Sequence, residues 1–171
     1  MPIPTPLSPR THALCSSWSY KEWAGKIAVR SYEPHSEREV VALRHTAGLI
    51  DVSPLYKYDV TGPDAAAFAS RVWCRDVGVM RVGRVAYSAM ADTHGLCLDD
   101  GTIARLDTDH FRFCTSEPWM HWWARHSRGF DVRIDDTTDD LAAISVQGPR
   151  ARDVLRDLVA WNLDRMRFFR V

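Results

Sequence analysis

The stretch Tyr58–Val72, YDVTGPDAAAFASRV, decides the fold because its pattern returns in Ile144–Leu158, ISVQGPRARDVLRDL. Each copy has a short β-type run, a Gly-Pro pair and an amphipathic helical run. Proline suits the first turn of a helix because it has no N–H to leave unpaired, and glycine lets the preceding strand turn sharply. We interpret both Gly-Pro pairs as strand-to-helix joints rather than phosphate-binding loops. The repeat predicts an α+β fold of duplicated, ferredoxin-like β-Gly-Pro-α units with an antiparallel sheet.

The start of the chain is expected to hold an N-terminal arm, residues 1–35, followed by a helix. Met1–Pro9 carries four prolines and no hydrophobic periodicity, which is typical of a loosely ordered segment. Ser36–Glu39 fits the capping box and predicts a helix over Glu37–Ala47. Gly48 is expected to end that helix in a left-handed conformation.

The segment between the two repeated units has a mainly β pattern. Strands are predicted at Arg84–Ala91, Thr102–Leu106, His110–Thr115 and Phe130–Ile134. Ser116 is expected to cap a helix that runs to about Ser127. That helix carries Trp119, Trp122 and Trp123 on one face, which favours a role in the core or at an interface.

Composition excludes several classes of function. Acidic and basic residues balance at 22 each, so nothing indicates binding to nucleic acid or to an anionic membrane. No apolar run approaches the roughly 20 residues of a membrane span. The four cysteines form no Cys-x-x-Cys motif and predict reduced thiols in a cytoplasmic protein, without a metal site.

The chemistry centres on two adjacent carboxylates, Asp99 and Asp100, followed by Gly101. Neighbouring acids repel each other and need water or a cationic partner. A solvated hairpin turn is one interpretation, because Asp-Gly is a strong turn signal. The other is that one carboxylate lines a pocket and handles a proton or a cationic nitrogen.

Five segments, in order, resemble the folate-binding aminomethyltransferase family, which includes the T-protein of glycine cleavage and the folate domains of sarcosine- and dimethylglycine-oxidising enzymes. They are Glu39–Ser53, Val60–Pro63, Gly83–Tyr87, Leu98–Asp100 and Val146–Pro149. The string Asp99–Leu106 is most similar to the sarcosine-oxidising branch. Members of the family are longer than this chain, so the resemblance implies that residues 36–171 are the N-terminal part of such a domain, and an incomplete one. Pro54 stands where the T-protein usually has histidine.

The resemblance implies a tetrahydrofolate-dependent transfer of a methyl or aminomethyl group from a small methylated amine or a related donor. A carboxylate near the folate nitrogens would orient the nucleophile and accept a proton. The family's catalytic aspartate corresponds to Asp100, with Asp99 as second choice. Tyr87 and Met90 are expected to bind the cofactor. A half-buried strand tyrosine and a core methionine are the alternatives for these two residues.

Two other functions remain open at this point. The chain can be a folate-binding module without chemistry of its own, or a half-domain that needs a partner chain or a second copy of itself. Both alternatives keep folate and a small methylated compound as the ligands to test. An exposed apolar face would favour the half-domain, because a sheet that lacks part of its strands has unpaired edges.

Overall fold

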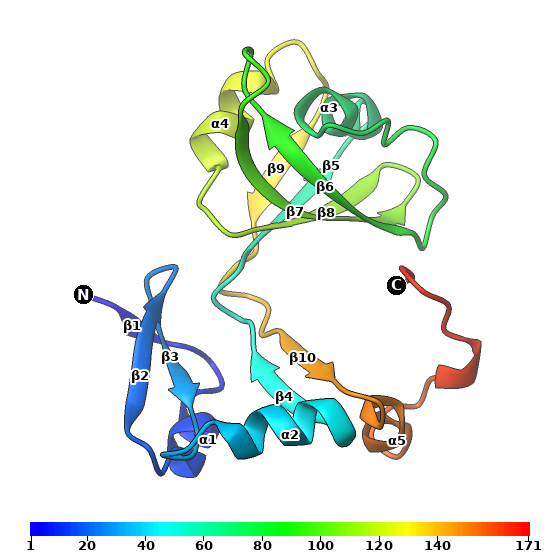
Figure 1. Cartoon of the computed structure of the whole chain (residues 1–171). Helices are drawn as coiled ribbons and strands as arrows, with labels where there is room; N and C mark the ends of the chain where they lie inside the picture. Colours follow the sequence, from blue (N-terminus) through cyan, green and yellow to red (C-terminus); the bar gives the residue numbers. More distant parts are fainter. The chain divides into compact units, whose positions relative to one another are not determined.

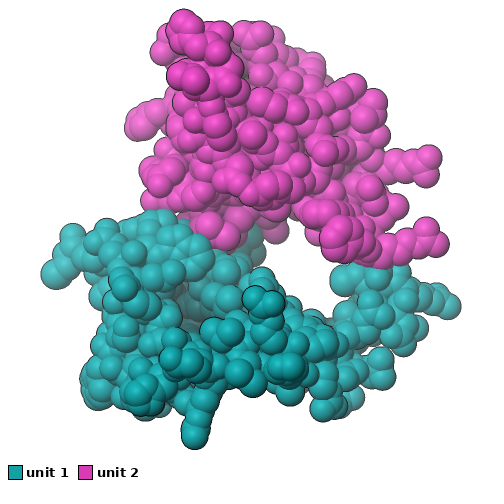
Figure 2. Space-filling model, in the orientation of Figure 1, with its two compact units in different colours: residues 1–54, 141–166 teal, residues 55–140, 167–171 magenta.

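A computed structural model describes all 171 residues, from Met1 to Val171. The chain forms two compact units, which Figure 2 colours separately. The first unit combines residues 1–54 with 141–166, and the second combines residues 55–140 with 167–171. Each unit is therefore built from two separate stretches of the chain. None of the helices has the length and apolar character needed to cross a membrane.

The second unit is built on a five-stranded antiparallel sheet of order β6-β7-β8-β5-β9 (Figure 1). The strands are β5 (Tyr56–Thr61), β6 (Val85–Ala91), β7 (Cys97–Asp107), β8 (His110–Thr115) and β9 (Arg133–Asp136). Helices α3 (Ala65–Val72) and α4 (Met120–His126) pack against the buried side of the sheet. Side chains alternate along a strand. The sheet therefore has an inner face, toward these helices, and an outer face.

Aromatic side chains fill the space between the inner face and the two helices. Tyr58, Phe113 and Trp123 are fully buried, and the Trp123 ring centroid lies 5.4 Å from that of Phe113 and 6.1 Å from that of Tyr58. Trp119 and Trp122 are partly buried against the same cluster. Burial of each large side chain contributes about 1.5–3 kcal/mol. The tryptophan face of α4 is thus part of the core, as the sequence indicated.

The first unit contains two small sheets. A three-stranded sheet has the order β1-β3-β2, and a two-stranded antiparallel sheet pairs β10 with β4. The strands are β1 (Ile3–Pro4), β2 (Ser19–Trp23), β3 (Lys26–Ser31), β4 (Gly48–Asp51) and β10 (Ile144–Gln147). The helices are α1 (Ser8–Leu14), α2 (Glu37–His45), α5 (Ala151–Arg156) and the 3-10 turn η1 (Leu163–Arg165).

Both Gly-Pro pairs are strand-to-helix joints, β5 to α3 and β10 to α5, as predicted. The φ angle is +131° at Gly62 and +117° at Gly148, a region that glycine occupies without strain. A Cβ on Gly62 would collide with the carbonyl oxygen of Asp131, and a Cβ on Gly148 with that of Thr46. Together with the sheets and helices described above, these joints confirm the predicted α+β class with an antiparallel sheet. Each proline, however, lies in the turn before its helix rather than in the first helical turn.

Residues 1–35 differ from the expected arm. They form β1, α1, β2 and β3, and they belong to the first unit. Pro9 is tolerated because it lies in the first turn of α1, where its missing N–H would be unpaired anyway. The chain divides near residues 54 and 140 instead of at residue 36.

The helix expected at Glu37–Ala47 is present as Glu37–His45, but its capping is different. Ser36 makes no side-chain cap. The Glu39 carboxylate instead accepts backbone N–H groups of Tyr32 and Glu33, at 2.6 and 2.9 Å. Gly48 does not have a positive φ and begins β4. The Glu39 carboxylate therefore bonds to the segment before the helix instead of completing the predicted capping box.

Candidate functional site

The acidic pair lies within strand β7, not in the turn that Asp-Gly indicated. Asp99 pairs with Met90 of β6, and Asp100 pairs with Ala89. Because consecutive strand residues point to opposite faces, the two carboxylates are separated by the sheet itself. Asp99 is on the inner face and Asp100 is on the outer face. The repulsion between adjacent acids is thereby avoided.

Asp99 is an anchor for the segment that leads from β8 to α4. Its carboxylate accepts the Ser116 hydroxyl at 2.7 Å and the Trp119 indole N–H at 2.7 Å. Backbone N–H groups of Asp100, Ser116 and Glu117 also donate to it, at 2.8, 3.2 and 3.1 Å. Burial alone would raise the pKa of Asp99, but the hydrogen bonds from Ser116 and Trp119 outweigh it and lower the pKa.

This arrangement also corrects the cap expected at Ser116. Helix α4 begins at Met120, and its preceding residue Trp119 makes no side-chain cap. The Ser116 hydroxyl donates to Asp99 rather than accepting a helix N–H group. The hydrogen bond to the charged carboxylate is stronger than a bond between the neutral hydroxyl and a helix N–H group.

Asp100 is exposed and its carboxylate makes no hydrogen bond or ion pair within the chain. Tyr87 lies on the same outer face, with its side chain 55% exposed. The register places Tyr87 opposite Thr102, two residues along β7 from Asp100. Residues so placed are diagonal neighbours, within reach of an aromatic side chain. The structure therefore brings Asp100 and Tyr87 to one exposed surface, which we call the Tyr87–Asp100 surface.

Met90 is not part of that surface. It lies three residues after Tyr87 on β6, so it points to the inner face, and it is fully buried in the core. A ligand on the outer face would not touch it. The expectation that Met90 binds the cofactor is therefore not supported, and the core alternative describes its position.

The outer face also carries a charged network; the sequence indicated that Arg112 pairs with an acid at the surface but did not identify its partner. Arg112 donates through Nε and Nη2 to the two oxygens of Asp59, at 2.6 and 2.8 Å. The His110 Nε2 atom lies 3.2 Å from Asp59 Oδ2. Burial would raise the pKa of Asp59, but the guanidinium of Arg112 and the nearby imidazole lower it. The alternation of polar and apolar residues in β5 and β8 was the available signal, but only strand pairing shows which charges meet.

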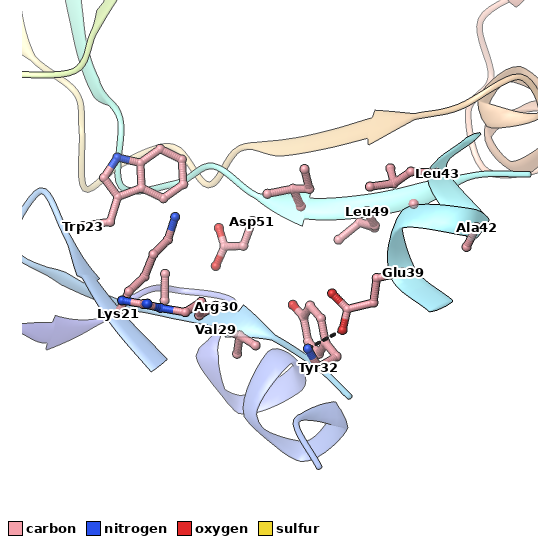
Figure 3. A pocket seen from close by; sticks show the side chains of 13 residues that line it. Lys21, Trp23, Val29, Arg30, Tyr32, Glu39, Ala42, Leu43, Leu49 and Asp51 are labelled. Carbon is pink, nitrogen blue, oxygen red and sulfur yellow. Dashed lines mark hydrogen bonds between the residues drawn. The ribbon is translucent and has the colours of Figure 1, made fainter. Parts of the chain in front are cut away.

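A separate pocket of about 430 Å³ lies in the first unit (Figure 3). Its walls come from β2, β3, α2 and β4, with Val29, Leu43 and Leu49 among the apolar side chains. Asp51 in this pocket accepts the Thr5 hydroxyl at 2.6 Å and the backbone N–H of Ser53 at 3.0 Å. None of the site residues predicted from the sequence lines it.

Comparison with known proteins agrees with this fold. The family described as GCVT N-terminal domain matches residues 11–171. The sarcosine oxidase subunit alpha of Rhizobium meliloti is 34% identical over 150 residues, which are 83% of this chain and 15% of that protein. The aminomethyltransferase of Lysinibacillus sphaericus is 35% identical over 133 residues, 75% of this chain and 36% of that protein.

The fold also resembles a solved structure, the glycine cleavage system aminomethyltransferase T from Bartonella henselae. The TM-score is 0.86 at 22% identity, over 98% of this chain and 46% of that one. The chain belongs to the GCVT N-terminal domain family. It spans less than half the length of the curated relatives and of this structural neighbour.

Proposed function

We propose that this chain supplies the catalytic carboxylate for a tetrahydrofolate-dependent one-carbon transfer from a small methylated amine or a related donor, with Asp100 in that role. The observation that carries the proposal is the contrast between the two acids of β7. Asp99 is buried and accepts five hydrogen bonds, whereas Asp100 is exposed and accepts none from the chain. A group that binds a ligand must be available to it, and only Asp100 meets this condition.

The Tyr87–Asp100 surface fits a reduced pterin. The Asp100 carboxylate is an acceptor for ring N–H groups and a counter-charge for a nitrogen that becomes cationic. The exposed Tyr87 ring offers a flat apolar face and a hydroxyl group. Bound tetrahydrofolate would supply the nitrogen nucleophile that takes up the one-carbon unit.

The residues of the chain would have distinct tasks in this reaction. Asp100 would orient the reacting nitrogen and accept its proton as the new N–C bond forms, while the bond between the one-carbon unit and the donor breaks and the donor leaves with that electron pair. Asp99 does not touch the ligand. Its bonds to Ser116 and Trp119 fix β7 against α4, and so they fix the position from which Asp100 projects.

The same observations bear on a second candidate, a half-domain that needs further polypeptide to complete the ligand site. The two-stranded β4–β10 sheet has no further strand on either side. Leu49 is 50% exposed and Ile144 is 49% exposed on these strands. Exposed apolar strands with unpaired edges are typical of surfaces that other chain segments cover. In this case Asp100 would still be the catalytic group, but folate binding would require both parts.

The test is an anaerobic calorimetric titration of the full 171-residue chain with tetrahydrofolate, compared with Asp100→Asn. Asp109→Asn is the matched control, because Asp109 is an exposed acid in the β7–β8 turn of the same unit. We expect binding that Asp100→Asn weakens by about tenfold, the equivalent of 1.4 kcal/mol, and that Asp109→Asn leaves unchanged.

Two results would count against the proposal. Equal binding by Asp100→Asn and the unmodified chain would remove Asp100 from the site. Absence of binding by a chain shown to be folded would reject the self-contained site. The titration would then be repeated after co-expression with the remaining portion of the Lysinibacillus sphaericus aminomethyltransferase, and binding only in that complex would establish the half-domain candidate.

A further inference from the structure

A second pocket of the molecule, of about 410 Å³, lies in the second unit at the start of β6. Its lining is arginine and apolar side chains: Arg75, Arg81, Arg84, Arg170, Val79, Met80, Val85 and Ala86. No acidic residue lines it. We call it the arginine pocket. It shares no residue with the Tyr87–Asp100 surface or with the pocket of the first unit.

Backbone pairing forces two of these arginines together. The Val85 N–H group donates to the Phe169 carbonyl at 3.1 Å, and the Val171 N–H group donates to the Gly83 carbonyl at 3.1 Å. This antiparallel bridge places Arg84 directly opposite Arg170. Like charges in directly opposite positions destabilise a strand pair. The fold therefore holds a repulsive pair at the edge of the sheet.

No ion pair within the chain offsets the repulsion. The four guanidinium groups of the pocket take part in none of the salt bridges of the chain, whereas Arg112 and Arg133 are paired with Asp59 and Asp135. Desolvation lowers the pKa of Arg170, and so do the charges of Arg84, Arg167 and Arg81. An anion in the pocket would relieve this excess of positive charge.

The loop that carries Arg75 and Arg81 is held by hydrogen bonds and by a buried side chain. Val77 is fully buried, and its N–H group donates to the Ser70 hydroxyl at 2.9 Å. Arg105 Nη1 donates to the carbonyl of Met80 at 2.5 Å. The guanidinium groups therefore start from a fixed backbone, which reduces the entropy lost when a ligand binds.

We propose that the arginine pocket binds a small polyanion that carries carboxylate or phosphate groups. Guanidinium groups form paired, charge-assisted hydrogen bonds with both kinds of oxyanion. The volume lies within the range of small-molecule sites, and Val79 and Val85 provide an apolar wall for a carbon skeleton. The site is separate from the proposed transfer reaction and does not depend on it.

The test titrates the full chain with two probes, pyrophosphate and the tripeptide triglutamate, by calorimetry at low and high salt. The test variant is Arg84→Gln/Arg170→Gln. The matched control is Arg125→Gln/Arg128→Gln, which removes the same charge from two exposed arginines at the end of α4 that lie outside the pocket. We expect at least one probe to bind, with a loss of tenfold or more in the test variant and less than twofold in the control.

The unliganded proteins give a second readout. Because Arg84→Gln/Arg170→Gln removes the repulsive pair, its melting temperature should equal or exceed that of the unmodified chain. Such a result would show that weaker binding by this variant is not caused by unfolding. If this variant nevertheless does not fold, Arg81→Gln tests the pocket from its exposed loop. Stronger binding of pyrophosphate would identify a phosphate ligand, and stronger binding of triglutamate a carboxylate ligand. Failure of a folded chain to bind either probe at millimolar concentration, or equal weakening in test and control variants, would overturn the proposal.

Discussion

The indole N–H of Trp119 donates to the carboxylate of Asp99 at 2.7 Å, so a residue just before α4 is joined to strand β7, which pairs with the edge strand β6. Ser116 donates to the same carboxylate at 2.7 Å. The buried acid thus organises the β8–α4 connection, while its neighbour Asp100 remains exposed. Two adjacent and chemically identical residues have different environments because the strand points them to opposite faces.

Replacement of Asp99 should therefore damage stability, whereas replacement of Asp100 should not. Asp99→Asn loses charge-assisted hydrogen bonds, each of which contributes about 1.5–3 kcal/mol, and the amide N–H₂ group would face other donors. We expect a loss of about 2–4 kcal/mol in the free energy of unfolding. This is less than the sum over the individual bonds, because the contributions of neighbouring bonds are not additive. Asp100→Asn should change it by less than about 0.5 kcal/mol. Urea unfolding followed by tryptophan fluorescence measures both, and equal losses would contradict the two roles.

The tryptophans near α4 should respond differently to the same mild substitution. Trp119→Phe keeps an aromatic ring but removes the donor to Asp99, whereas Trp122 makes no hydrogen bond to that carboxylate. Trp119→Phe should lose about 1–3 kcal/mol more than Trp122→Phe. The comparison is a double-mutant cycle with Asp99→Asn, in which Trp119→Phe should couple and Trp122→Phe should not. Additive effects of Trp119→Phe and Asp99→Asn would rule out the bond as a source of stability.

Stability should fall in acid because two carboxylates have a lowered pKa in the folded state, Asp59 and Asp99. An acid with a depressed pKa stabilises the fold above its unfolded pKa, near 3.9. That contribution is lost as the pH drops through the folded pKa. Thermal melts between about pH 6 and pH 2 should show a steep decline below about pH 4. The decline should be shallower in Asp99→Asn, and an unchanged profile in that variant would contradict the assignment.

The glycines of the two joints should resist substitution. Gly62→Ala places a methyl group against the carbonyl of Asp131 in addition to the strain of a positive φ. Gly95 also has a positive φ, +79°, but nothing lies within 4 Å of a Cβ placed there. Gly95→Ala should therefore lose only about 1 kcal/mol, from backbone strain. We expect Gly62→Ala to lose about 1–3 kcal/mol more than Gly95→Ala, the usual loss at overpacked positions. Differential scanning calorimetry of the two variants tests the difference.

Local sequence patterns predicted the kinds of secondary-structure element correctly, but they predicted the capping residues of the helices less well. The β-Gly-Pro-α units and the strand at Arg84–Ala91 were predicted because alternation and turn residues act locally. The caps at Ser36 and Ser116 were wrong. At the first, the Glu39 carboxylate of the capping box accepts N–H groups before the helix instead of that of Ser36, and at the second the distant Asp99 takes the Ser116 hydroxyl. Local propensity is weak compared with such contacts.

The site was predictable only in part. The sequence pointed to the acidic pair and to Tyr87, because the resemblance rests on residues rather than on geometry. The resemblance favoured Asp100 over Asp99, but the residues alone gave no environment for either acid, and Met90 was grouped with Tyr87. Strand register makes both distinctions, since it assigns every side chain of β6 and β7 to one face.

By itself, then, the sequence determined the α+β class, the repeated joints and the family, because each is written in the order of local patterns along one chain. The tertiary structure alone decided that Asp99 is buried, that Asp100 and Tyr87 share an exposed face, and that Arg84 meets Arg170. These relations join residues that are neighbours in space, and neither composition nor spacing along the sequence specifies which residues become neighbours. Pairing between strands sets them, and the pairing is chosen by burial of the whole core at once.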